Sequence, residues 1–336
     1  MNIIEQQKEK SFFHTLSPDN VIGLVEDTYG CDCTNLFRPL NSYINRVFEL
    51  EQDDGTGLIV KFYRPGRWSK AAIQDEHDFL LDLQESEIPV VAPLTHGKGE
   101  TLGQHEDVCF AVFPKCGGRS LDEYNDDQWL ELGRLLARFH NFGEERQLND
   151  RVVMAPDKST RKHVAYILDN NLVPTASVGQ FQELTDILVR EITPLFSGQE
   201  MIVIHGDCHF ANIIYRPKES FYLIDLDDMS MGPPVQDLWM LLPDYMENSL
   251  VEIDMFLEGY ETFRRFDKRS LRLVEPLRAM RYIHYIAWCA YQVVNDGQTL
   301  VNSSFGTDHY WQVEIKDLAD QLARIRKMDD HLGNYY

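Results

Sequence analysis

The sequence predicts an α+β fold with two lobes, a mainly β N-terminal lobe and a mainly α C-terminal lobe. Two observations carry this prediction. Short segments with strand-like alternation or apolar runs dominate as far as Pro114, and long segments with apolar residues at helical spacing dominate from residue 121 onward. Strands followed by helices in this way are typical of α+β architecture. The length of 336 residues suits two closely packed domains.

The elements of the first lobe are predicted in chain order from their local patterns. Ser17 followed by Pro18 is a good helix start, and Val21 lies on the apolar face of that helix. Strands are expected at the end of 37–50, at 58–63, in the region 88–93 and at 108–114, with a helix around 71–80 and a turn at 53–57.

The second lobe is predicted to be built from helices. Trp129, Leu132, Leu136 and Phe139 recur at helical spacing and predict a helix over 121–142. His140, at the end of that helix, is interpreted as a packing residue. Residues 145–170 show no clear pattern. Further helices are expected at about 180–195, from residue 237, and at 251–266, 271–294 and 310–328.

Composition limits the classes of partner and compartment. Hydrophobic residues make up 43% of the chain, so it is globular, and 54 acidic against 32 basic residues give a net charge of −22. A surface of that sign repels phosphate backbones, so no nucleic-acid partner is expected. No apolar run reaches membrane-spanning length, no signal peptide is visible, and the six cysteines show no paired C-x-x-C spacing. We therefore expect a cytoplasmic protein without membrane partners.

The densest chemistry lies between Met201 and Asp227. An apolar strand ends abruptly before Asp207, Asn212 follows after four residues, and a predicted hairpin then leads back to Asp225. Because a hairpin returns its second strand to the level where the first began, Asn212 and Asp225 are expected side by side, with Asp207 on the preceding loop. Magnesium prefers carboxylate and amide oxygens, which suits Asn212 and Asp225 as ligands. Asp207 suits the acceptance of a hydroxyl proton.

The motif HGDCHFAN, followed by LIDLDD, resembles the aminoglycoside phosphotransferase and choline kinase superfamily. The segments GPPVQDLWMLL and EPLRAMRYIHYIAW extend the resemblance to the bacterial stress response kinase A group, which is classed as serine/threonine protein kinase. The resemblance implies a protein-kinase-like two-lobed fold. Residues 1–115 would form the nucleotide-binding lobe and residues 116–336 the catalytic and substrate lobe, with the hinge after the strand at 108–114.

The same resemblance implies roles for residues of the first lobe. Lys61, within LIVKFY, would orient the phosphates of ATP. Glu76 would be the carboxylate partner of Lys61, with Asp75 as the alternative partner. The loop LNSYINRVF lacks the glycines that usually approach phosphate, and Ser42 at its tip is expected to contact the nucleotide. Asp227 would assist at a second metal or hydrogen-bond the loop.

The expected reaction is transfer of the γ-phosphoryl group of ATP to a hydroxyl, with Mg²⁺ as cofactor, Asp207 and Asp225 as catalytic residues, and Asn212 and Asp225 as metal ligands. The resemblance implies a serine or threonine of a protein as acceptor, and a small alcohol such as an aminoglycoside, choline or homoserine is the runner-up. Asp237 is expected either to cap its own helix or to brace the catalytic loop.

Two other interpretations remain open from the sequence. His205, Asp207 and His209 resemble ligands of a metallohydrolase, although that interpretation leaves the spacing to Asn212 and Asp225 unexplained. The glycine-free loop alone is consistent with a pseudokinase that serves as a binding module.

Overall fold

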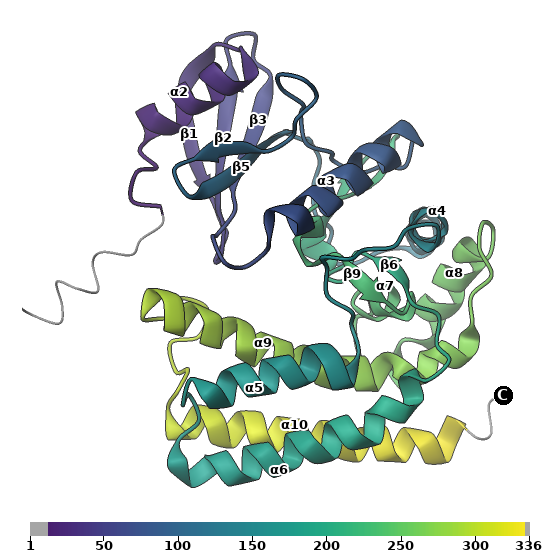
Figure 1. Ribbon diagram of the computed structural model, residues 1–336. Coiled ribbons are helices and arrows are strands. Elements are labelled where there is room, and N and C mark those ends of the chain that lie inside the picture. The colour runs from purple at the N-terminus through teal and green to yellow at the C-terminus, as the bar shows by residue number, and fades with distance from the viewer. Residues whose placement is uncertain (1–12, 333–336) are drawn as a thin grey trace, which may run out of the picture. The chain divides into compact units, whose positions relative to one another are not determined.

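The computed structural model describes residues 13–332, with the side chains of 328–332 excepted. The chain divides into two compact units (Figure 1). The first consists of the residues up to Arg119 together with Ile214–Asp227, and the second of Ser120–Ile213 together with the residues from Asp228 onward. The predicted order is confirmed, because the large sheet lies in the first unit and most helices lie in the second. The boundary expected near residue 115 stays a prediction.

The first unit is built on an antiparallel sheet of five strands in the order β1-β2-β3-β5-β4. The strands are β1 (Cys33–Leu40), β2 (Arg46–Gln52), β3 (Gly57–Phe62), β4 (Gly103–His105) and β5 (Val108–Pro114). On β3, Lys61 lies opposite Val47 of β2 and Ala111 of β5, so it occupies the middle of the sheet.

Two helices of the first unit pack against side chains in β3 and directly after it. Helix α2 (Pro18–Tyr29), capped by Ser17 as predicted, packs Val21 into a core with Val60 and Phe62. Helix α3 (Lys70–Glu85) packs Ile73 against Tyr63, the residue after β3. Successive side chains of a strand point to opposite faces. Lys61 therefore lies on the face opposite to Val60 and Phe62, and the same alternation places Tyr63 with α3.

Two expectations for the first unit differ from the structure. Strand β1 was not expected as a separate strand, because its residues Cys33–Leu40 alternate poorly in burial. The strand expected in 88–93 is wrong, since Val90 makes only an isolated parallel bridge with Leu223. Pro89 and Pro93 lack the backbone N–H that a ladder needs, which explains why the segment does not extend into a strand.

The predicted hairpin is present as β7 (Ile213–Arg216) and β8 (Ser220–Leu223), which pair with each other. It packs with the first unit, where Tyr215 bridges Arg119 and Leu223 bridges Val90. Asp225 follows β8 by two residues, and Asn212 immediately precedes β7.

The second unit contains a small sheet of β6 (Ile202–Ile204) and β9 (Ser230–Gly232), which run antiparallel. Its longer helices are α4 (Asp126–Glu144), α5 (Arg161–Asp169), α6 (Thr175–Ile192), α8 (Leu250–Tyr260), α9 (Val274–Asp296) and α10 (Asp308–Leu332). Short helical segments are a π-helical turn (Pro156–Thr160), α7 (Val235–Trp239) and 3₁₀ turns at Thr193–Phe196, Phe210–Asn212, Met246–Asn248 and Lys268–Leu273.

Helix α5 is the main element that the sequence did not predict. It has nine residues, and Ile167 is its one fully buried side chain. A segment this short offers few repeats of the helical period on which prediction rests. Helices α4 and α8 pack with unusually close backbones. A Cβ atom on Gly133 would lie 2.1 Å from the carbonyl oxygen of Phe256, and one on Gly259 would lie 2.1 Å from that of Leu130. Of the helices that the structure describes, none combines the length and apolar composition needed to cross a membrane.

Candidate active site

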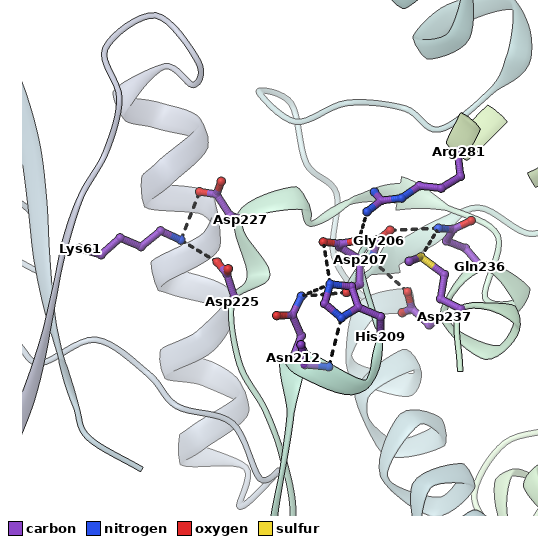
Figure 2. A network of polar contacts seen from close by, with 12 residues as sticks. Lys61, Gly206, Asp207, His209, Asn212, Asp225, Asp227, Gln236, Asp237 and Arg281 are labelled. Atoms are coloured by element: carbon purple, nitrogen blue, oxygen red, sulfur yellow. Dashed lines mark hydrogen bonds and ion pairs between the residues drawn. The ribbon is translucent and has the colours of Figure 1, made fainter. Parts of the chain in front are cut away.

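In the first unit, Lys61 is the centre of a charged cluster. Its side chain is buried, and its Nζ atom lies 2.8 Å from Oδ1 of Asp225 and 3.3 Å from Oδ1 of Asp227 (Figure 2). An unpaired ammonium at this depth would be costly. The apolar strand therefore carries a lysine because two carboxylates from the segment after β8 neutralise it.

Opposing effects act on the pKa of Lys61. Burial by itself lowers it, but the charges of Asp225, Asp227 and Glu76 raise it well above the usual value. Lys61 is thus charged across the whole physiological range. Glu76, the expected partner, is almost completely buried on α3 and acts on Lys61 as the third of these carboxylates. The two ion pairs with Asp225 and Asp227 were not expected from the sequence.

Asp225 and Asp227 differ in what surrounds them. The side chain of Asp227 is 8% exposed and Asp225 is 52% exposed. Oδ2 of Asp227 lies 3.1 Å from Nη2 of Arg67 and accepts a hydrogen bond of 3.4 Å from Nδ2 of Asn45. Asp227 is therefore enclosed by donors of its own unit, whereas the carboxylate of Asp225 is half exposed to solvent. No local pattern in the sequence marked Arg67 or Asn45.

Asn45 also connects this cluster to the loop between β1 and β2. Its Oδ1 atom accepts a hydrogen bond of 3.1 Å from the backbone N–H of Arg64, while its Nδ2 atom reaches Asp227. Ser42 lies half-buried in the same loop, three residues earlier. The glycine-free β1–β2 loop is thus held in place by the buried Asn45, directly before β2.

In the second unit, β6 leads directly into the loop that carries Asp207. Its three residues are buried, as the sequence predicts. Gly206 has φ of +82°, and a Cβ atom there would lie 2.3 Å from the carbonyl oxygen of Asp228. Both the left-handed backbone and the close contact require glycine at this position.

Asp237, at the start of α7, braces this loop. It is fully buried, and its two carboxylate oxygens accept hydrogen bonds from the backbone N–H groups of His205 (2.8 Å) and Gly206 (2.9 Å). Of the two roles considered for Asp237, the geometry therefore supports the brace. Oδ2 also lies 3.0 Å from Nε2 of His140, whose Nδ1 atom is 2.9 Å from the hydroxyl of Tyr260. His140 thus lies in a buried network with Asp237 and Tyr260, and its structural role stays an interpretation.

Asp207 itself is mostly buried and is held from two sides (Figure 2). Oδ1 lies 2.7 Å from Nη2 of Arg281 on α9, and Oδ2 lies 3.5 Å from Nε2 of His209. Burial raises the pKa of the Asp207 carboxyl, but the contacts with His209 and Arg281 lower it by more, so that the net shift is downward. An ionised carboxylate in this position can accept a hydrogen bond from a hydroxyl group.

Asn212 is oriented by the same loop. Its Nδ2 atom donates to the backbone oxygen of Asp207 at 3.0 Å and lies 3.4 Å from Nε2 of His209. Among the described residues, no donor reaches its Oδ1 atom, which leaves an amide oxygen of the kind that a hard cation prefers. Within the described part of the chain, no three His, Cys, Asp or Glu side chains cluster as a metal site. The structure thus offers no support for the metallohydrolase interpretation.

Comparison with known proteins decides the family. The model of the phosphotransferase enzyme family matches residues 37–274. The chain belongs to the phosphotransferase enzyme family. It is 38% identical over 277 residues to stress response kinase A of Escherichia coli (strain K12), which covers 82% of this chain and 83% of that protein. It is 37% identical over 281 residues to the serine/threonine protein kinase RdoA of Salmonella typhimurium (strain LT2), with the same coverage.

Solved structures of kinases share the fold. Amicoumacin kinase hAmiN, in complex with AMP-PNP, Ca²⁺ and Ami, has a TM-score of 0.74 and 20% identity, over 95% of this chain and 96% of that one. Choline kinase LicA from Streptococcus pneumoniae has a TM-score of 0.63 and 17% identity, over 90% and 98% of the two chains. The expected α+β fold of the kinase-like type is therefore confirmed, and the protein is a phosphotransferase of this family.

Proposed function

We propose that the protein transfers the γ-phosphoryl group of ATP, with Mg²⁺, to the hydroxyl of a serine or threonine in a protein substrate. The observation that supports this chemistry is the ionised carboxylate of Asp207, on the loop His205–Asp207 that Asp237 braces. The buried, charged Lys61 on β3 supplies a cation that can bind the phosphates. The observation that favours a protein acceptor is the 37% identity to the serine/threonine protein kinase RdoA over 82% of the chain.

In this proposal each residue has a distinct task. Lys61, kept charged by its carboxylate neighbours, orients the phosphates, and Ser42 contacts the nucleotide from the β1–β2 loop. Oδ1 of Asn212 and the exposed carboxylate of Asp225 would hold Mg²⁺, which neutralises charge on the phosphates when it is bound. Glu76 supports Lys61 from α3.

Asp207 acts on the acceptor. Its carboxylate accepts a hydrogen bond from the attacking hydroxyl, aligns the oxygen with the γ-phosphorus, and takes the proton as the new P–O bond forms and the bond to the leaving ADP oxygen breaks. Phosphoryl transfer depends largely on positioning and charge neutralisation, so the rigid attachment of the loop to Asp237 contributes directly.

A small alcohol is the second candidate acceptor. The solved relatives with this fold include a choline kinase and an aminopropanol kinase. Their identities of 17% and 18% show the fold alone, so they support this candidate less than the serine/threonine protein kinase RdoA, at 37% identity, supports a protein acceptor.

The test is to incubate the purified protein with γ-labelled ATP and Mg²⁺, once with a protein mixture and once with a panel of alcohols. Asp207→Asn serves as the matched variant and should reduce transfer by about 10²-fold or more while nucleotide binding is kept. Label on serine or threonine that Asp207→Asn abolishes supports the proposal. Label on alcohols alone supports the second candidate, and binding of ATP without any transfer indicates a pseudokinase.

A further inference from the structure

Arg281 has more hydrogen-bonding capacity than the described structure uses. Its side chain is 30% exposed on α9, and in the part of the chain that the structure describes its one polar contact is the 2.7 Å approach of Nη2 to Oδ1 of Asp207 (Figure 2). That contact is ionic and poorly aligned, since Oδ1 is buried and accepts no well-formed hydrogen bond there. A guanidinium carries five N–H donors, so most of those of Arg281 remain for another partner.

The neighbours of Arg281 along α9 are half-buried and aromatic. His284, Tyr285 and Trp288 follow it at spacings that share a helix face, and the ring of His284 lies 4.9 Å from that of His163 on α5. Burial lowers the pKa of His163 to about 4, so this ring is neutral near pH 7. Arg281 therefore supplies a permanent positive charge on this face.

The charge that the structure places next to Arg281 is the carboxylate of Asp207. Asp228 raises the pKa of both Asp207 and His163, so its charge acts on the same region. Among the described residues, Arg281 is the permanent cation that pairs with Asp207, so an acceptor hydroxyl that approaches Asp207 also meets the guanidinium.

We propose that Arg281 determines acceptor specificity by binding a carboxylate next to the acceptor hydroxyl and by disfavouring acceptors that carry an ammonium group there. The preferred acceptor is then a serine or threonine in an acidic peptide segment. The planar guanidinium matches a carboxylate with two parallel hydrogen bonds and is never deprotonated in proteins. This inference rests on the proposed transfer reaction and specifies which charge the acceptor carries next to its hydroxyl. The match to the family model ends at residue 274, before Arg281.

The experiment compares serine peptides that are identical except for glutamate or lysine on both sides of the serine. Transfer from γ-labelled ATP gives the ratio of kcat/KM for the two peptides. The wild type should prefer the glutamate peptide by about tenfold or more, because placing like charges side by side is strongly unfavourable. Arg281→Gln should lower this ratio by about tenfold, and Arg281→Lys, which keeps the charge, should retain the preference for glutamate.

Arg269→Gln is the matched control. It removes the same charge from the second unit at an exposed residue that pairs with Asp267, and it should leave the ratio unchanged. A ratio that Arg281→Gln does not alter, or a wild-type preference for lysine, overturns the inference while the proposed function stands. If no peptide is labelled, the proposed acceptor fails. The affinities of the unlabelled peptides for wild type and Arg281→Gln, measured by calorimetry, then decide the inference separately: equal losses for both peptides, or none, overturn it.

Discussion

Asp237 is a single buried carboxylate with three donors around it. Its carboxylate oxygens accept hydrogen bonds from the backbone N–H groups of His205 and Gly206, and Oδ2 also lies near Nε2 of His140. Each of these donor–acceptor distances is at most 3.0 Å. A group that satisfies several buried donors is difficult to replace, because each donor left without an acceptor costs about 1–3 kcal/mol. Asp207 depends on this arrangement because it directly follows the two residues whose amides are held.

Asp237→Asn should therefore destabilise the protein. An amide offers one oxygen in place of two and turns an NH₂ group toward backbone donors, so we expect the free energy of unfolding to fall by about 3 kcal/mol. Urea unfolding measures the change. The matched control is Asp320→Asn, whose carboxylate is 67% exposed and pairs with Lys316; its effect should stay within about 0.5 kcal/mol. Equal effects of the two variants would contradict the role assigned to Asp237.

At the scale of elements, the close packing of α4 and α8 holds the helical unit together on backbone contacts. Gly133 and Gly259 each face a backbone oxygen of the other helix, so neither site has room for a side chain. Gly143, near the end of α4, faces the carbonyl oxygen of Val203 in β6 in the same way. Helix α4 thus contacts both α8 and β6, the strand that leads into the loop of Asp207.

Gly259→Ala should force α4 and α8 apart, because its methyl group would meet the backbone of Leu130. Overpacking of this kind costs about 1–3 kcal/mol, measured as a fall in the free energy of unfolding. Gly179→Ala is the control. That glycine lies exposed in α6 with nothing within 4 Å of an added Cβ, so alanine should stabilise the helix by up to about 1 kcal/mol. Opposite signs for the two substitutions are expected; loss of stability in both would refute the packing argument.

At the scale of the whole molecule, the chain crosses between its two units inside one short motif. Asp207 and Asn212 belong to the second unit, and Asp225 and Asp227 belong to the first, although all four lie within one stretch of sequence. The hairpin β7–β8 accounts for this, since it packs with the first unit. Residues that are neighbours in sequence are thus held by different cores.

Stability of the whole protein should depend on pH through His163. Its folded pKa of about 4 lies below the ordinary value of 6.5, with burial as the main cause, opposed by Asp228 and reinforced by Lys162. The unfolded chain therefore binds more protons between these values, and stability is lost as the pH falls through this window. Between pH 7.5 and pH 5 the loss from this group is about 2 kcal/mol.

Urea unfolding at both pH values measures the effect. His163→Gln should reduce the loss of unfolding free energy between pH 7.5 and pH 5 by about 2 kcal/mol relative to wild type. His309→Gln, at an exposed histidine of α10, is the matched control for the loss of a histidine. A His163→Gln protein with the wild-type pH dependence would show that His163 is protonated equally in both states.

The sequence alone was enough to predict the elements whose signals are local. The helix start at Ser17, the strand before His205, the hairpin after Asn212 and the lysine in an apolar strand all follow from patterns within a few residues. These patterns depend on backbone sterics, caps and apolar periodicity, which act at short range. The positions of these elements could be predicted for this reason, whereas the kinase-like fold and the expected roles of the HGD residues came from the resemblance of HGDCHFAN and LIDLDD to a known superfamily.

Only the tertiary structure decided which distant groups meet. Lys61 pairs with Asp225 across 164 residues of sequence, Asn45 reaches Asp227 across 182, and His140 meets Asp237 across 97. The ion pair of Arg281 with Asp207 is also a contact between distant residues, and no pattern in the sequence near Arg281 predicts it. Buried charges and unsatisfied donors are costly wherever they lie in the chain, so their partners are selected by packing in three dimensions, which no local pattern records.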